Sequence, residues 1–228
     1  MKSVKVDKRI TGILSFLSNC NCVADIGCDH GLTCVCAIIL KKAKFAIATD
    51  ISDLSLNKAK AKAEKENLED VFDFRCGDGL SVLKKNEADT IIISGVGGEL
   101  LTKILDDGKH ILSKNTKLIL SANNKEELVR RWIIENEFCI IDESIVFEKG
   151  KYYQIIVAEF GSEKPYTDLQ LELGKINILK RDEVFLSYMN RKIKGMNIVI
   201  KNIEKNSNNS IKQNEFIKKL REYKEIIK

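Results

Sequence analysis

Acidic residues and glycines lie close together in one short stretch near the N-terminus, Val23–Gly31, which reads VADIGCDHG. Glycine lets a backbone turn tightly and approach a ligand without a Cβ in the way. The spacing D-x-G-x-x-x-G differs from the G-x-G-x-x-G of a pyrophosphate cradle, and the carboxylates of Asp25 and Asp29 would repel a pyrophosphate. They suit the cationic aminoacyl end of S-adenosylmethionine instead. The stretch therefore predicts a site for that cofactor, although a glycine turn alone is weak evidence.

Two more acids follow later apolar runs. Asp50 could accept hydrogen bonds from both ribose hydroxyls of a nucleoside, or it could cap a helix together with Ser52. Asp78, between two glycines, could face the exocyclic amine of adenine, or G-D-G could be ordinary turn chemistry. Acids after the first three strands fit the crevice where doubly wound sheets bind ligands. The predicted cofactor site is Asp25, Gly27, Cys28, Asp29, Gly31, Asp50, Ile51, Gly77, Asp78, Gly79, Ser94 and Gly95.

The elements that must position these residues alternate along the chain. Short runs rich in Val, Ile, Ala and Phe predict buried strands, and the longer amphipathic stretches between them predict helices. Such alternation implies a parallel sheet with helices on both faces. The predicted strands are Cys22–Ile26, Phe45–Thr49, Val71–Arg75, Thr90–Ser94 and Lys117–Ser121. The predicted helices are Leu32–Lys41, Asp53–Glu66, Gly98–Ile111 and Lys125–Asn136.

Two extended runs then follow each other directly, Phe138–Phe147 and Tyr152–Phe160, joined by the polar turn Glu148–Lys151. They predict an antiparallel β-hairpin that completes a mostly parallel seven-stranded sheet. Nucleotide-binding dehydrogenase folds usually end with another parallel strand. The hairpin therefore indicates an α/β Rossmann-like domain of the class I methyltransferase type.

The C-terminal part of the chain has a different pattern. The chain's one proline, Pro165, marks a predicted boundary between a methyltransferase domain, residues 1–162, and a helical domain, residues 163–228. Apolar residues there recur at heptad spacing, interrupted by a polar loop at Asn206–Ser210, which predicts an antiparallel coiled-coil hairpin. The seam residues are Leu186, Met189, Ile193, Met196, Ile200, Ile203, Phe216, Leu220, Tyr223 and Ile227. This seam could be satisfied within one chain or between two; we expect a monomer.

Charge is unevenly distributed. Residues 161–228 hold 15 Lys and Arg against 9 Asp and Glu, a balance of +6, whereas the whole chain carries +5. The excess predicts contact with a polyanion, and a solvated lysine-rich helix surface is the equally weighted alternative.

Several classes of protein are disfavoured. No apolar run approaches the roughly 20 residues that span a bilayer, and no signal-peptide core follows the basic N-terminus, so we expect a cytoplasmic protein with no membrane partner. The pairs Cys20–Cys22 and Cys34–Cys36 raise the question of zinc, but their C-x-C spacing is shorter than in zinc sites. We expect buried apolar cysteines and no metal.

Together, VADIGCDHG, the GDGL of Gly77–Leu80, the glycine loop Gly95–Gly98 and the hairpin ending YYQIIVAEF resemble the TrmK family of bacterial tRNA (adenine-22-N1)-methyltransferases. The resemblance implies methyl transfer from S-adenosylmethionine, with S-adenosylhomocysteine as product, to N1 of an adenine in tRNA. It implies a base-binding role for Asn123, and the open glycine loop suggests the same for Gly97 and Gly98. The family usually has Gln-Pro where this chain has Ser121-Ala122, and often Glu in place of Asp50.

Methylation leaves the adenine ring cationic, so a nearby carboxylate would stabilise the transition state. We expect Asp29 to be that catalytic carboxylate and His30 to orient it or the base; His30 could equally be a helix-start histidine with no such role. Two alternative functions remain open: methylation of another RNA, a small molecule or a protein, and catalytically silent RNA binding.

Overall fold

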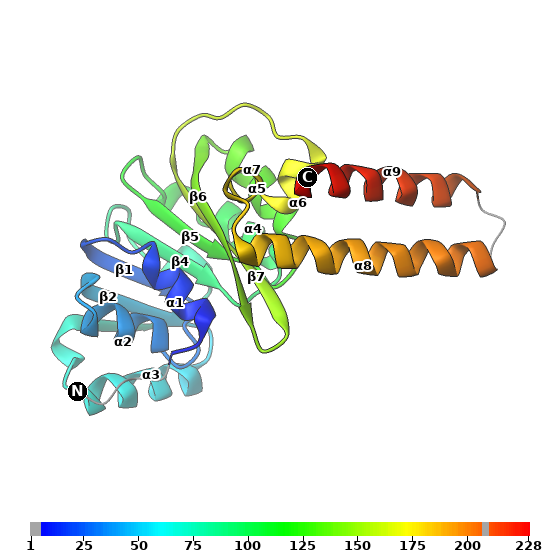
Figure 1. Ribbon diagram of the computed structural model, residues 1–228. Helices are drawn as coiled ribbons and strands as arrows, with labels where there is room; N and C mark the ends of the chain where they lie inside the picture. The colour runs from blue at the N-terminus through cyan, green and yellow to red at the C-terminus, as the bar shows by residue number, and fades with distance from the viewer. Residues whose placement is uncertain (1–5, 207–209) are drawn as a thin grey trace. The chain divides into compact units, whose positions relative to one another are not determined.

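Seven strands form one sheet in the order β3-β2-β1-β4-β5-β7-β6, in a computed structural model that describes residues 6–206 and 210–228 (Figure 1). The first five strands pair in parallel, and β6 and β7 form the antiparallel end of the sheet. The prediction of a class I methyltransferase fold is confirmed. The strands are β1 Cys20–Ile26, β2 Ala43–Asp50, β3 Phe72–Cys76, β4 Thr90–Ser94, β5 Lys117–Ser121, β6 Phe138–Glu148 and β7 Lys151–Phe160.

The central strand β1 is hydrogen-bonded to β2 on one side and to β4 on the other. Its residues from Val23 to Ile26 are all buried because helices cover both faces of the sheet. The same holds for Ile91–Ile93 of β4 and Leu118–Leu120 of β5. These continuous apolar runs are what made the strands recognisable in the sequence.

Helices α1, α2 and α3 pack beside one another and contribute to one core cluster, and α4, α5 and α6 form a second contiguous group. The helices of this part are α1 Lys8–Ser15, α2 Leu32–Ile39, α3 Asp53–Lys65, α4 Gly98–Asp107, α5 Glu126–Glu135 and α6 Asp168–Leu173. Short 3₁₀ turns are η1 Glu69–Val71, η2 Gly79–Val82 and η3 Lys109–Ile111.

Two differences from the sequence prediction have local causes. The helix expected over Gly98–Ile111 ends at Asp107 because Gly108 interrupts it, and η3 follows. Helix α1 was not predicted. Asp7 caps it by accepting a hydrogen bond from the Ile10 amide, and its apolar face buries Ile13 and Leu14.

The hairpin turn is tighter than expected. Strand β6 extends to Glu148 and β7 starts at Lys151, so the turn consists of Lys149 and Gly150, both with positive φ (48° and 82°). Two left-handed residues match the twist of the flanking strands, as in tight hairpin turns generally.

A buried ion pair fastens α5 to the hairpin. Arg130 and Glu143 are both fully buried, and the Arg130 Nε donates to Glu143 Oε1 at 2.6 Å. The other guanidinium nitrogens donate to the Gln154 side chain and to the Leu171 carbonyl. Because every nitrogen has an acceptor, the buried charge is compensated, and α6 is tied to the sheet.

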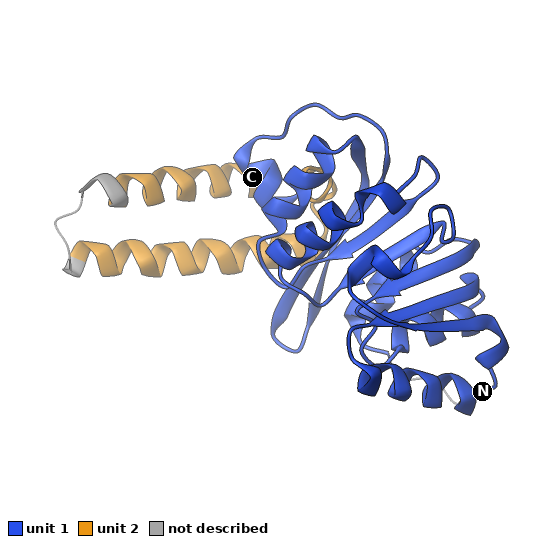
Figure 2. Ribbon diagram, turned by 180° about the vertical axis from the view of Figure 1, so that it is seen from behind, with its two compact units in different colours: residues 1–174 blue, residues 175–228 orange. Residues whose placement is uncertain are grey.

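The chain divides into two compact units, residues 1–174 and 175–228 (Figure 2). The second contains α7 Lys175–Lys180, α8 Glu183–Asn206 and α9 Ser210–Ile227, and α8 packs against α9. Each predicted seam residue is buried or half-buried, with Met189, Ile200, Leu220 and Tyr223 the most buried of them. Of the predicted loop Asn206–Ser210, residues 207–209 lie outside the described part. The domain boundary at 162–163 stays a prediction.

No helix in the described part of the chain is long and apolar enough to cross a membrane. Residues 6–206 and 210–228 contain no cluster of three or more His, Cys, Asp or Glu side chains arranged to hold a metal ion. The seven cysteines are free thiols, and Cys20, Cys28, Cys34 and Cys36 are buried.

We predict that replacing Arg130 with alanine lowers the free energy of unfolding by about 3–5 kcal/mol, because it leaves Glu143 buried without its partner. The melting temperature should fall by roughly 10 °C in a domain of this size. Arg131→Ala, at the exposed neighbouring position, is the matched control and should change it little. Equal melting temperatures of the two variants, measured by calorimetry, would contradict this role.

Candidate active site

A pocket of about 450 Å³ opens at the carboxyl ends of β1 and β4. These neighbouring strands continue into helices of different groups, α2 and α4, which makes this the topological switch point of the sheet. The pocket is lined from β1, α2, the β4 loop, α1 and α3 by Asp7, Arg9, Ile10, Asp25, Gly27, Cys28, Asp29, His30, Leu32, Thr33, Lys62, Ser94, Gly95 and Val96.

The β1–α2 turn has left-handed backbone at Gly27, Asp29 and Gly31, with φ of 72°, 50° and 63°. A Cβ built on Gly27 would meet no atom within 4 Å, so this glycine leaves open space in the pocket. A Cβ on Gly31 would lie 2.6 Å from the Cβ of Ala59. Gly31 therefore allows close packing of the turn on α3, whereas Gly27 allows close approach of a ligand.

Asp25 is the buried carboxyl of the pocket, with 3% of its surface exposed. Burial raises the pKa of Asp25 to about 7, and the charge of Asp50 adds to this, while a hydrogen bond with Thr33 and the charge of Arg9 act in the opposite direction. A cation bound beside Asp25 would favour its ionised form. The pocket thus presents a carboxylate suited to an ammonium group.

Asp50 holds the β1–α2 turn in place from the next strand. Its Oδ2 accepts from the Asp29 amide at 3.0 Å and its Oδ1 from the Ser52 amide at 2.9 Å. Ser52, rather than Asp50, is the N-cap of α3. Two carboxylate oxygens offer about four acceptor sites, so Asp50 keeps capacity for ribose hydroxyls. Ile51 beside it is 73% exposed.

Asp29 and His30 lie where the turn meets solvent, and both line the pocket. The Asp29 side chain is 71% exposed, and its Oδ1 is 3.3 Å from Nδ1 of His30. Because the Asp29 backbone amide is bonded to Asp50, the residue's position is fixed although its carboxylate is accessible.

The loop after β3 lies apart from this pocket. Asp78 is exposed and lines a smaller hollow of about 170 Å³ with Gly79, Leu80, Ser81, Ile104 and Asp107. The Gly77 amide donates to the Asp50 carbonyl at 3.0 Å, which links the two loops through their backbones. The structure therefore connects Asp78 to the site through Asp50 but does not place it in the larger pocket.

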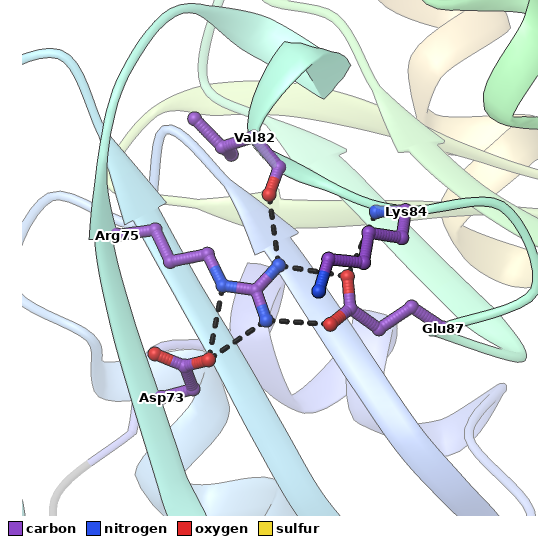
Figure 3. Close-up of polar contacts among 5 residues, drawn as sticks. All are labelled: Asp73, Arg75, Val82, Lys84 and Glu87. Atoms are coloured by element: carbon purple, nitrogen blue, oxygen red, sulfur yellow. Dashed lines mark hydrogen bonds and ion pairs between the residues drawn. The ribbon is translucent and has the colours of Figure 1, made fainter.

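Arg75 holds this loop and the following segment to the sheet edge (Figure 3). Its guanidinium donates to both oxygens of Glu87 at 2.6 and 2.7 Å, to Asp73 at 2.7 and 3.0 Å, and to the Val82 carbonyl at 2.8 Å. Glu87 also accepts from the Lys84 amide. The Arg75 guanidinium lowers the pKa of Glu87 to about 2. The network fixes both ends of the segment that contains Asp78.

Of the residues predicted to bind the base, Asn123 is hydrogen-bonded to two residues of the pocket lining. The Asn123 side-chain nitrogen donates to the Gly95 carbonyl, and its backbone N–H donates to the Val96 carbonyl. A Cβ on Gly98 would collide with the backbone carbonyls of Asn124 and Lys125. Asn123, Gly97 and Gly98 are absent from the described pocket lining, and their contact with a base stays a prediction.

Sequence reasoning missed Arg9. It lies in the pocket lining on α1, with its guanidinium 5.2 Å from the centre of the Tyr153 ring. A Cβ on Gly95 would lie 3.5 Å from its Nη1. The available signal was the cap Asp7 followed by apolar Ile10, Ile13, Leu14 and Leu17, which predicts a short amphipathic helix.

Comparison with known proteins supports this arrangement. Residues 6–156 match the family model "Methyltransferase domain". The tRNA (adenine(22)-N(1))-methyltransferase of Bacillus subtilis (strain 168) is 38% identical over 177 residues, covering 77% of this chain and 74% of that protein. The fold and the site define the class: the chain is a class I methyltransferase.

Solved structures identify the family within this class. The crystal structure of B. subtilis TrmK, an m1A22 tRNA methyltransferase, superposes with a TM-score of 0.85 at 31% identity, covering 99% of this chain and all of that one. A Streptococcus pneumoniae protein, Sp1610, solved with S-adenosyl-L-methionine, gives 0.87 at 26% identity, covering 98% and 100%. The chain belongs to the TrmK family of tRNA (adenine(22)-N(1))-methyltransferases.

We predict that Glu87→Gln destabilises the protein at neutral pH, since it removes the charge that Arg75 binds. The carboxylate's pKa is depressed from 4.5 to about 2, so its contribution is present above pH 4.5 and is lost as the pH falls toward 2. In urea unfolding at pH 7, 4 and 3, the difference in unfolding free energy between Glu87→Gln and wild type should shrink as the pH falls. Glu64→Gln on the exposed face of α3 is the control. A difference independent of pH would argue against the ion pair.

Proposed function

We propose that this chain transfers a methyl group from S-adenosylmethionine to N1 of adenine 22 in tRNA. The observation that carries the proposal is the pocket at the switch point, where a buried carboxyl (Asp25) and an arginine (Arg9) line the same cavity. The aminoacyl end of S-adenosylmethionine carries one ammonium and one carboxylate, which these two side chains complement. The B. subtilis relative's activity on tRNA supports the choice of substrate.

The residues around the pocket fit the rest of the cofactor. The open space at Gly27 leaves room for a ligand against the backbone, and Asp50 retains acceptor sites for ribose hydroxyls. We assign the adenine of the cofactor to the loop that contains Asp78, beside Ile51. When bound, S-adenosylmethionine supplies an electrophilic methyl group on a sulfonium centre.

Asp29 is the carboxylate that we assign to catalysis. Adenine N1 already has a lone pair, so the enzyme needs no base to activate it, and catalysis consists of positioning and electrostatics. Positive charge develops on the adenine ring as the methyl group is transferred. The exposed Asp29 carboxylate, held in place through its amide and lying 3.3 Å from His30, can stabilise that charge.

We also propose that the enzyme acts as a monomer in the cytoplasm. The apolar seam of α8 and α9 is buried at Met189, Ile200, Leu220 and Tyr223 by packing within one chain.

The basic excess of residues 161–228 would supply sequence-independent contacts with phosphates.

The direct test uses tritiated S-adenosylmethionine and two unmodified tRNA transcripts that differ only in adenine or guanine at position 22. We expect label on the first transcript alone, recovered as 1-methyladenosine after digestion to nucleosides. Equal labelling of both would place the target elsewhere. Binding of tRNA without any labelling would indicate a catalytically silent RNA-binding protein.

Asp29→Asn should reduce turnover at least about 100-fold, because it removes the carboxylate charge from the transition state. Asparagine tolerates the left-handed backbone at this position as well as aspartate does, so the turn should persist. Calorimetry should show S-adenosylmethionine binding within a few-fold of wild type. Turnover at the wild-type rate would refute the catalytic assignment.

Gly27→Ala should weaken S-adenosylmethionine binding by an order of magnitude or more, because the added methyl enters the space left for the ligand. Gly150→Ala in the hairpin turn is a matched control: its φ is also positive, and its Cβ would also meet nothing within 4 Å. Both variants carry backbone strain of about 1–3 kcal/mol. If both bind the cofactor equally well, Gly27 does not face it.

A further inference from the structure

The tip of the β6–β7 hairpin lies at the same edge of the sheet as the pocket. Strand β5 is parallel to β1 and β4, and its Leu120 pairs with Ile156 of the antiparallel β7. Residues 151–154 of β7 therefore extend past the carboxyl end of β5, by about 14 Å at 3.4 Å per residue. Figure 1 shows the hairpin reaching beyond the neighbouring strands.

One face of this tip is aromatic and accessible. Phe147 and Tyr152 are directly paired across the strands, with ring centroids 4.6 Å apart, and Phe147 is 41% exposed. Between them lie two exposed lysines, Lys149 in the turn and Lys151 at the start of β7. Exposed aromatic rings beside lysines are the combination that binds single-stranded nucleic acid, by stacking with bases and by contact with phosphates.

The other face of the tip is fastened to α1. The Lys8 amide donates to Glu148 Oε2 at 3.1 Å. A Cβ on Gly12 would lie within 3 Å of side-chain atoms of Ile155 and Val146, so helix and hairpin are in close contact.

Arg9 connects this assembly to the pocket. It lines the pocket and also contacts the ring of Tyr153, which is paired with Val146 on the hairpin. The aromatic tip is thus held at a fixed place relative to the site of methyl transfer.

We propose that this tip, defined by Phe147, Lys149, Lys151 and Tyr152, binds an unpaired stretch of tRNA next to the target adenine. The inference rests on the proposed function. It adds a second tRNA-binding surface, on the methyltransferase unit, to the one proposed for the basic C-terminal segment. An adenine must leave its stack to be methylated, which leaves neighbouring bases free to stack on a protein ring. The rings hold such a base, and the two lysines contact its flanking phosphates.

The test compares two exposed aromatic residues of the same hairpin. Phe147→Ala should raise the Kd for tRNA about tenfold, as expected for one lost stacking contact, and leave S-adenosylmethionine binding unchanged. Phe160→Ala is the matched control, because Phe160 is 37% exposed and lies at the opposite end of β7. Phe147→Leu keeps the apolar packing without the π face and should behave like Phe147→Ala. Wild-type tRNA affinity in both Phe147 variants would overturn the proposal.

The lysines are tested through the salt dependence of binding. Lys149→Gln with Lys151→Gln should reduce the slope of log Kd against log salt concentration by about 1–2. Lys65→Gln with Lys85→Gln, exposed positions outside the tip, changes the net charge equally and should leave the slope unchanged. Equal slopes for the two double variants would count against the tip.

These measurements separate the two proposals. Methylation of tRNA by wild type together with normal tRNA binding by the tip variants would refute the tip alone. Specific tRNA binding without methylation would refute the catalytic function and still test the tip through Kd. A change of oligomeric state in Phe147→Ala, seen by light scattering, would identify the tip as a contact between copies of the chain and overturn the RNA proposal.

Discussion

The parallel pairing of β1 between β2 and β4 is the constraint on which the rest of the site depends. Parallel strands end at one edge of a sheet, so the residues after β1, β2 and β4 are brought together there. The backbone continues this convergence beyond the strands. The Cys28 amide donates to the Thr49 carbonyl, the Asp29 amide to Asp50, and the Gly77 amide to the Asp50 carbonyl. Each of these loops is thus positioned by hydrogen bonds to the neighbouring strand end.

Electrostatic conditions differ sharply over the short distance from Asp25 to Asp29. Asp25 is buried, and loss of hydration raises its pKa to about 7. Asp29 lies four residues later with its side chain mostly exposed. One turn therefore presents the same chemical group in two environments, a desolvated carboxyl at Asp25 and an accessible carboxylate at Asp29, and these match the two roles that we propose for them.

Two arginine-centred networks join different segments of the chain. Arg75 joins Asp73 and Glu87 around the β3–β4 connection, and Arg130 joins α5, the hairpin and the α6 segment. Both guanidiniums donate to several acceptors, which makes their geometry specific. The hairpin held in this way extends past the carboxyl ends of the parallel strands, where the pocket opens, and α1 connects it to the pocket. The antiparallel end of the sheet thereby contributes to the surface around the site.

The sequence by itself determined the strands, most helices, the heptad seam and the acids at the strand ends, because apolar periodicity and turn chemistry are local properties of the chain. It missed α1, although the cap Asp7 and the helical spacing of Ile10, Ile13 and Leu14 signal a short amphipathic helix. The tertiary structure alone decided which acids share a pocket: Asp25 and Asp29 meet Arg9 there, whereas Asp78 lies in a separate hollow. It also placed the Asn123 side chain against Gly95, 28 residues earlier in the chain. Such contacts, and the pKa of Asp25, depend on segments far apart in sequence that become neighbours only when the sheet forms.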